Sequence, residues 1–171
     1  AYELDPLAPN VATFMGMNLF FAGRNDAAIV QLRTATTAQN DNWFASAWLA
    51  RAYARAGRYP EAIAAARKAH ELAPQYAEAE STLGRTYADA GEKAEAEKVL
   101  DHLRERARIE LVAPPYFATI LIGLGRFDEA LVELAKAAEE RSWYVMNWKV
   151  DPDLDPLRGD PRFQALLEKV G

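Results

Sequence analysis

Residues 43–76 read WFASAWLARAYARAGRYPEAIAAARKAHELAPQY, two amphipathic segments on either side of a glycine. Gly57 is followed five residues later by Ala62, and this pair of residues recurs along the chain every 34 residues. A fixed period of this size indicates one supersecondary unit that is copied and stacked, because a single unit cannot bury its apolar face alone. The recurring positions are Gly23, Gly57, Gly91 and Gly125, with Ala28, Ala62, Ala96 and Ala130.

The first segment of each unit is expected to be a helix with two large apolar positions four residues apart, which places them on one face. A column of small residues between those positions predicts close helix packing. The repeated glycine is expected to end this helix, because it adopts positive φ at little steric cost. The large positions are Met15, Leu49, Leu83 and Phe117, then Leu19, Tyr53, Tyr87 and Leu121; the small column is Gly16, Ala50, Gly84 and Ala118.

The second segment of each unit also has a single apolar face, with spacings of four and then three residues. The alignment needs no insertion or deletion and gives four units, residues 9–42, 43–76, 77–110 and 111–144. The face consists of Ala28, Ala62, Ala96 and Ala130, then Leu32, Ala66, Leu100 and Leu134, then Ala35, Ala69, Leu103 and Ala137.

The second unit resembles the tetratricopeptide repeat in Leu49, Ala50, Tyr53, Gly57, Tyr59, Ala62, Ala69 and Pro74. The resemblance covers roughly residues 9–144 and is strongest in units two and three. It implies an all-α fold, a right-handed superhelix (α-solenoid) of antiparallel helix pairs. It also implies a noncatalytic protein-protein interaction module that binds a peptide or protein segment in the concave groove formed by successive first helices.

Both ends of the chain depart from the four units. Glu3-Leu4-Asp5-Pro6 repeats Glu71-Leu72-Ala73-Pro74 two periods away, which predicts that residues 1–8 are the end of a truncated preceding helix in a longer protein. The prolines of residues 145–160 predict a segment that wraps rather than continues a helix. Asp160-Pro161 then predicts a helix start. Residues 145–171 are therefore expected to form a wrap and a capping helix, with an apolar stripe of Phe163, Leu166, Leu167 and Val170.

The string Asp155-Pro156-Leu157-Arg158-Gly159-Asp160-Pro161-Arg162-Phe163 resembles the ending of many bacterial tetratricopeptide regions. Such regions often follow kinase, cyclase or winged-helix regulatory domains. This resemblance implies an alternative role, an intramolecular regulatory or scaffolding arm of a larger bacterial signalling protein such as a kinase, cyclase or transcription regulator.

Composition argues against several classes of function. The net charge of −5 disfavours a general partnership with nucleic acid or anionic lipid. The chain has no cysteine, and no apolar run approaches the ~18 residues typical of a membrane helix. No serine lies in a nucleophile motif and no glycine-rich phosphate loop occurs. We therefore expect a protein that is not an enzyme, has no cofactor, does not insert into membranes and is cytoplasmic.

Asp151, Asp153 and Asp155 have the spacing that opens a calcium loop, but Pro156 replaces the expected glycine and Arg162 the bidentate glutamate. The sequence therefore favours acids that solvate a turn and assist local capping. His70 and His102 lie on different second helices without further ligands, so no metal site is predicted.

The predicted groove is basic and aromatic in its middle. Arg51 and Arg55 are one helical turn apart and Arg85 lies one repeat beyond Arg51, which suits carboxylates. Large aromatic side chains beside this charge are typical of interaction hot spots. We therefore predict an acidic or carboxylate-bearing protein or peptide partner. The predicted peptide-binding residues are Phe44, Trp48, Arg51, Arg55, Arg85 and Tyr116; Ala47, Glu78, Ser81, Thr82 and Asp89 face the same groove.

Other interpretations of these residues remain open. Arg85 can pair with Asp89 within its helix while Arg51 and Arg55 stay solvated. The aromatic column of Phe14, Trp48 and Tyr116 can simply pack between first helices. In the tetratricopeptide family, the carboxylate-clamp members bind the C-termini of heat-shock chaperones through lysines and asparagines in the groove. The groove positions of this sequence lack those residues, which argues against chaperone C-termini as partners. Thr13, Met17, Phe20 and Phe21 make the first groove section apolar, which predicts an exposed patch and self-association through the truncated N-terminal face.

Overall fold

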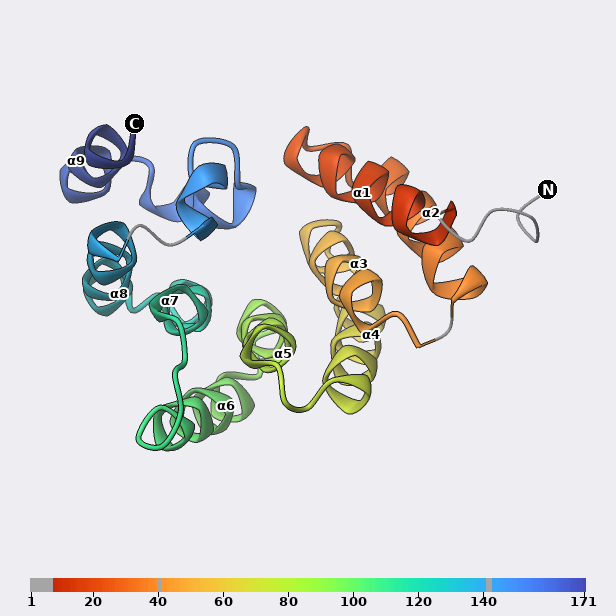
Figure 1. Cartoon of the computed structure of the whole chain (residues 1–171), viewed down its shortest axis with the longest axis horizontal. Helices are drawn as coiled ribbons and strands as arrows, with labels where there is room; N and C mark the ends of the chain where they lie inside the picture. The colour runs from red at the N-terminus through yellow and green to blue at the C-terminus, as the bar shows by residue number, and fades with distance from the viewer. Residues whose placement is uncertain (1–7, 40, 141–142) are drawn as a thin grey trace.

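The computed structural model describes residues 8–39, 41–140 and 143–171, and this part of the chain contains helices and no strand. Successive helices pair and follow one another along a curved row, with α3, α5 and α7 on its inner side (Figure 1). The fold is an all-helical solenoid. Its paired helices are α1 (Ala8–Phe21), α2 (Asn25–Ala38), α3 (Trp43–Arg55), α4 (Tyr59–Leu72), α5 (Ala77–Asp89), α6 (Lys93–Arg106), α7 (Pro114–Gly123) and α8 (Phe127–Glu139).

The apolar face predicted for the second helices is confirmed. Ala28, Ala62, Ala96 and Ala130 are all fully buried, as are the leucine and alanine positions that follow them on the same face. In the first helices the predicted face is buried in units two and three, where Leu49, Leu83, Tyr53 and Tyr87 are each less than a tenth exposed. The core therefore runs as a ribbon along the solenoid between the two layers of helices.

The small-residue column allows the close packing that the sequence predicted. A Cβ atom added at Gly84 would lie 2.7 Å from Cδ1 of Ile120, closer than real Cβ contacts. The equivalent Ala50 is fully buried. The first helix of each unit also ends as predicted, because the repeated glycine after it adopts a φ between 70° and 82°.

The first unit differs from the prediction. Phe20 is fully buried and Thr13 is 2% exposed, so these residues do not form an open apolar patch. Phe20 is covered because it packs edge to face against Trp48 of α3, with ring centroids 5.5 Å apart. Within residues 10–21 of α1, the exposed large apolar side chains are instead Val11, Phe14 and Met15. The expected tail of a preceding helix covers residues 1–8, of which residues 1–7 lie outside the described residues and Ala8 begins α1.

The C-terminal part wraps back over the last repeats. It consists of two 3-10 helices, η2 (Trp143–Asn147) and η3 (Pro152–Leu157), followed by α9 (Pro161–Val170). We call residues 143–160 the strap. Trp148, Leu154 and Leu157 of the strap are buried in the same core cluster as the residues of α7 and α8. The strap is therefore anchored in the core by large apolar side chains.

Helix α9 begins at Pro161, where the side chain of Asp160 accepts a hydrogen bond from the backbone N–H of Arg162, as the sequence predicted. Phe163 is fully buried, and the rest of the predicted stripe packs against the core beside α8. The helix therefore covers the apolar face that α8 would otherwise expose.

Among the residues that the structure describes, no helix combines the length and apolar character needed to cross a membrane.

Candidate peptide-binding groove

The inner side of the solenoid forms a groove, defined here by the facing surfaces of α3, α5 and α7. Its lining contains eight of the eleven positions that the sequence placed in the middle of the groove, together with residues of the strap. Phe44, Arg55 and Asp89 are not part of the lining. Tyr144 and Asp153 are the strap residues in this lining, and the cavity that remains has a volume of about 20 Å³. The lining residues are Ala47, Trp48, Arg51, Glu78, Ser81, Thr82, Arg85, Tyr116, Thr119, Tyr144 and Asp153.

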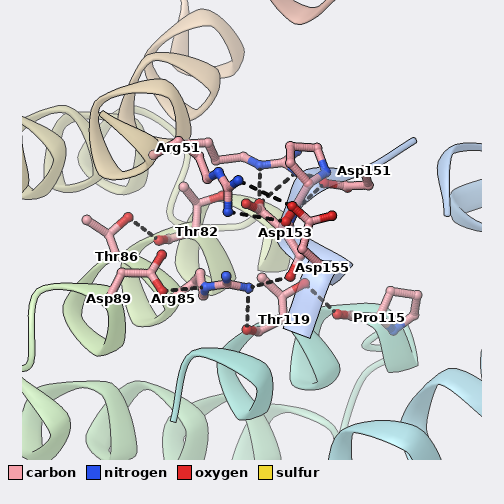
Figure 2. A network of polar contacts seen from close by, with 12 residues as sticks. Arg51, Thr82, Arg85, Thr86, Asp89, Pro115, Thr119, Asp151, Asp153 and Asp155 are labelled. Atoms are coloured by element: carbon pink, nitrogen blue, oxygen red, sulfur yellow. Dashed lines mark hydrogen bonds and ion pairs between the residues drawn. The ribbon is translucent and has the colours of Figure 1, made fainter. Parts of the chain in front are cut away.

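Arg51 is the centre of the polar contacts in this groove (Figure 2). Its Nε donates to Oδ2 of Asp153 at 2.8 Å, and its Nη2 donates to both carboxylate oxygens of Asp151 at 2.9 and 3.0 Å. The side chains of all three residues are at most 14% exposed. We call Arg51, Asp151 and Asp153 the clasp, because they join α3 to the strap.

Aromatic rings form the other wall around Arg51. Its guanidinium carbon lies 4.1 Å from the ring centroid of Trp48 and 4.6 Å from that of Phe20. Both distances are within the range of cation–π attraction. Trp48 is buried and also meets Phe21 edge to face, so it packs between the first helices α1 and α3. Trp48 therefore positions Arg51 as well as filling the interhelical contact.

Arg85 lies at the bottom of the groove on α5 and is nearly fully buried. Its Nε donates to Oδ1 of Asp89 at 2.8 Å, the intrahelical pair that the sequence allowed. Its Nη1 donates to the backbone carbonyls of Thr119 at 3.3 Å and Asp153 at 3.4 Å (Figure 2). Arg85 therefore connects α5, α7 and the strap.

Arg55 lies at the mouth of the groove, and its side chain is 36% exposed. It donates to the backbone carbonyl of Pro152 and to Oδ2 of Asp155, each at 3.3 Å. Asp155 is also held by Arg158, at 2.8 Å. The three arginines predicted from the sequence are thus brought together around one segment, residues 151–155.

The two remaining predicted residues lie at the sides of this cluster. Tyr116 is partly buried, and its backbone carbonyl accepts a hydrogen bond from the hydroxyl of Ser81 at 2.8 Å. Phe44 is partly buried and meets Trp48 edge to face, with ring centroids 6.2 Å apart. Tyr116 lines the cavity, whereas Phe44 supports Trp48 from behind.

The interpretation of the aspartates as acids that solvate a turn is wrong for two of them. Asp151 and Asp153 are 3% and 6% exposed, and both bind Arg51. The predicted capping role is correct for Asp151, whose side chain accepts the backbone N–H of Asp153 at 3.0 Å. The difference arises because Arg51 supplies charge-assisted hydrogen bonds that compensate for the water lost on burial.

The two clasp carboxylates are shifted in opposite directions. Burial alone would raise the pKa of Asp153, but the Arg51 and Arg85 guanidinium groups outweigh it and hold this pKa below its usual value. Burial raises the pKa of Asp151, opposed by attraction to Arg51 and reinforced by repulsion from Asp153. Asp153 is thus the carboxylate on which the two arginines converge.

Titratable groups elsewhere in the lining of the cavity are also shifted, among them Glu78 and Tyr116. Burial raises the pKa of Glu78, although Arg51 opposes the shift. Burial, and secondly the charge of Glu78, raises the pKa of Tyr116 to about 12. An additional negative charge in this part of the groove is therefore unfavourable unless an arginine compensates for it.

The sequence did not assign Asp151, Asp153, Thr119 or Tyr144 to the groove. One signal for the aspartates is present in the chain, because three acids at alternate positions match three arginines on two neighbouring first helices. Thr119 contributes a backbone carbonyl, which no side-chain pattern reveals.

Comparisons with known proteins agree with this architecture. Residues 54–110 match the family model of the tetratricopeptide repeat. The chain is similar to tetratricopeptide repeat proteins. A crystal structure of such a protein from Parabacteroides merdae ATCC 43184 has a TM-score of 0.56 and 21% sequence identity. The alignment covers 98% of this chain and 66% of that chain. Because the sequence identity is low, the likeness concerns the fold alone.

A second solved structure is a thermophilic protein with the same repeat from Thermus thermophilus, with a TM-score of 0.39 and 22% identity. That alignment covers 86% of this chain and 99% of the other. The matched segment of the family model extends from the end of α3 to the α6–α7 connection, the part in which the sequence pattern is strongest.

Proposed function

We propose that this chain is a noncatalytic protein-interaction module whose groove recognises an acidic segment of a protein. The tetratricopeptide fold generally serves protein-protein interaction, and the chemistry of the groove narrows the partner. The observation that carries the proposal is the geometry of Arg51, which holds two carboxylates at once beside the ring of Trp48. A guanidinium group with this fork geometry suits carboxylates that approach in one plane.

Selection from a library of peptides displayed on phage tests this proposal. The complete chain is expected to enrich segments rich in aspartate and glutamate. Arg55→Glu should abolish that enrichment, because Arg55 is the most exposed of the three arginines and is therefore the first that an acidic segment meets. Arg58→Glu is the matched control, since Arg58 is similarly exposed but pairs with Glu61 outside the groove. Enrichment that is not acidic, or that survives Arg55→Glu, would contradict the proposal.

The second candidate is an intramolecular regulatory arm, and one observation favours it. Residues 151–155 already occupy the three arginines, so the groove binds a segment of its own chain. If the chain acts only in this way, the phage selection should return no acidic segments for the complete chain. A larger parent protein of the bacterial signalling type stays a prediction.

Self-association also stays a prediction. The exposed apolar residues of α1 are Val11, Phe14 and Met15, which share one helical face. Light scattering over a range of protein concentrations would test this, with Phe14→Lys as the variant expected to remain monomeric.

A further inference from the structure

We propose that residues 151–155 are an internal ligand of the groove, and that the partner segment that replaces them carries carboxylates at alternate positions. This inference rests on the proposed function, because it names the partner class and the regulation of the same site. It means that the chain, as folded, is closed to its partner until α3 separates from the strap.

The strap is held in the way that a peptide ligand is held. Arg51 binds the side chains of Asp151 and Asp153, while Arg55 and Arg85 donate to the backbone carbonyls of Pro152 and Asp153. Contacts to the backbone carbonyls depend on the path of the bound main chain, and contacts to the carboxylates depend on the charge of its side chains. The same donors can therefore bind a segment supplied by another protein.

The spacing of the bound acids defines the partner. Asp151 and Asp153 are separated by one residue, and their carboxylates meet the same edge of one guanidinium group, Asp153 at Nε and Nη2 and Asp151 at Nη2. Asp155, at the next alternate position, reaches Arg55 one helical turn farther along α3. A segment with aspartates at positions i, i+2 and i+4 reproduces this set of contacts.

The volume of the remaining cavity shows that the groove is closed. Its 20 Å³ is far below the ~300 Å³ at the lower end of ligand pockets. Asp153 is one of the residues that line this cavity, and its carboxylate occupies Nε of Arg51. Binding at Arg51 therefore requires that the clasp opens first.

The strap is attached on one side by apolar packing and on the other by charge. Trp148, Leu154 and Leu157 pack into the core cluster that contains α7 and α8. The clasp joins the strap to α3, on the opposite wall of the groove. Opening therefore breaks ion pairs between α3 and the strap while Trp148 and Leu157, the anchors on either side of residues 151–155, remain in place.

Such an exchange is energetically accessible. A buried ion pair has a small net stability, because its attraction is largely offset by the water that both groups give up. When the clasp opens, Asp151 and Asp153 are hydrated again. The partner's carboxylates then take their place as the ion-pair partners of Arg51. The exchange keeps the number of guanidinium–carboxylate contacts constant.

The direct test is binding of an end-capped peptide with the sequence VDPDLDPL, which is residues 150–157. The double variant Asp151→Asn with Asp153→Asn is expected to bind it at least about tenfold more tightly than the wild-type chain, because apparent affinity scales with the open fraction. The charge-matched control is Asp101→Asn with Asp128→Asn, two exposed aspartates outside the groove, which should bind like wild type. A peptide with asparagine at both clasp positions should not bind.

The outcomes separate the two proposals. Equal binding by the wild-type chain and the clasp variant would overturn the internal-ligand inference and leave acidic recognition by the groove intact. Binding by neither protein would overturn both. Binding that persists when Arg51→Met is added to the clasp variant would place the peptide elsewhere and likewise overturn both.

A second measurement does not depend on the clasp variant folding. The chain has no cysteine, so Glu71→Cys on α4 and Lys149→Cys on the strap carry the only two spin labels. Both positions are exposed. Pulsed electron resonance on this otherwise wild-type chain should show a longer interlabel distance when the VDPDLDPL peptide is added in excess. An unchanged distance with bound peptide would contradict the requirement for opening.

Discussion

Nε of Arg51 lies 2.8 Å from Oδ2 of Asp153, although the two residues are 102 positions apart in the sequence. Contacts in a helical solenoid normally join neighbouring repeats. This contact instead joins α3 of the second unit to the strap that follows the fourth. It therefore fixes the curvature of the row of helices, because α3 cannot move away from α7 and the strap without breaking it.

Arg51→Ala is expected to destabilise the fold by about 3–5 kcal/mol, the usual cost of removing one partner from a buried ion pair. The reason is that Asp151 and Asp153 are left without their guanidinium partner in a region shielded from water. Urea unfolding followed by circular dichroism measures the change.

The control for this prediction is Arg58→Ala, which removes a pair with Glu61 in which both side chains are nearly half exposed. Exposed ion pairs contribute little to stability, so this variant should unfold at close to the wild-type urea concentration. Equal losses for the two variants would show that the clasp is no more important than a surface pair.

The stability supplied by Asp153 should disappear in acid. Its pKa is lowered in the folded state by Arg51 and Arg85, so its contribution is present above the unfolded pKa of about 3.9 and is lost as the pH falls through the folded pKa. Asp153→Asn should therefore be less stable than wild type near neutral pH, and the difference should shrink below about pH 4. Urea unfolding at a series of pH values measures it.

Asp151→Asn is the matched comparison, because burial raises the pKa of Asp151. A carboxyl group with a raised folded pKa favours the folded state most at low pH and loses that contribution as the pH rises. The two single variants should therefore show opposite pH trends. The same trend in both would contradict the assignment of Asp153 as the carboxylate stabilised by two arginines.

Much of the fold could be predicted from the sequence, because residues that recur at a fixed period define where each repeat begins and ends. The glycines 34 residues apart correctly predicted the ends of the first helices. The alanines that follow them correctly predicted the buried face of the second helices. The first unit was less predictable. Phe20 is buried by the neighbouring Trp48, and the pattern within one unit does not contain that contact.

The groove was predictable in part for the same physical reason. Arg51 and Arg85 share a repeat column and Arg55 lies one helical turn beyond Arg51, so their convergence follows from the repeat and the helical period. Their partners lie in the strap, whose sequence does not follow the 34-residue repeat. Whether Asp151 and Asp153 meet water or Arg51 depends on how the chain turns after α8, and side-chain spacing does not determine that path.

Ala62→Leu should destabilise the fold by about 1–3 kcal/mol, because extra methylenes at a fully buried position force neighbouring helices apart. Ala64→Leu on the same helix is the control, since Ala64 is exposed and leucine is nearly as good a helix former as alanine. Thermal unfolding measures both. Unchanged stability in Ala62→Leu would contradict the close contact assigned to this column.

Gly91→Ala tests the helix end that defines the repeat. Gly91 has a φ of 82° and a Cβ added there would meet no atom within 4 Å, so the expected cost is purely conformational. Left-handed backbone costs a residue other than glycine about 1–2 kcal/mol. Gly159→Ala is the control, because its added Cβ also meets nothing and its φ lies outside the left-handed region. Urea unfolding should therefore show a loss in Gly91→Ala alone, because alanine at a compatible φ restricts the unfolded chain and does not destabilise the fold. Equal losses in both variants would contradict the assignment of the effect to the αL turn after α5.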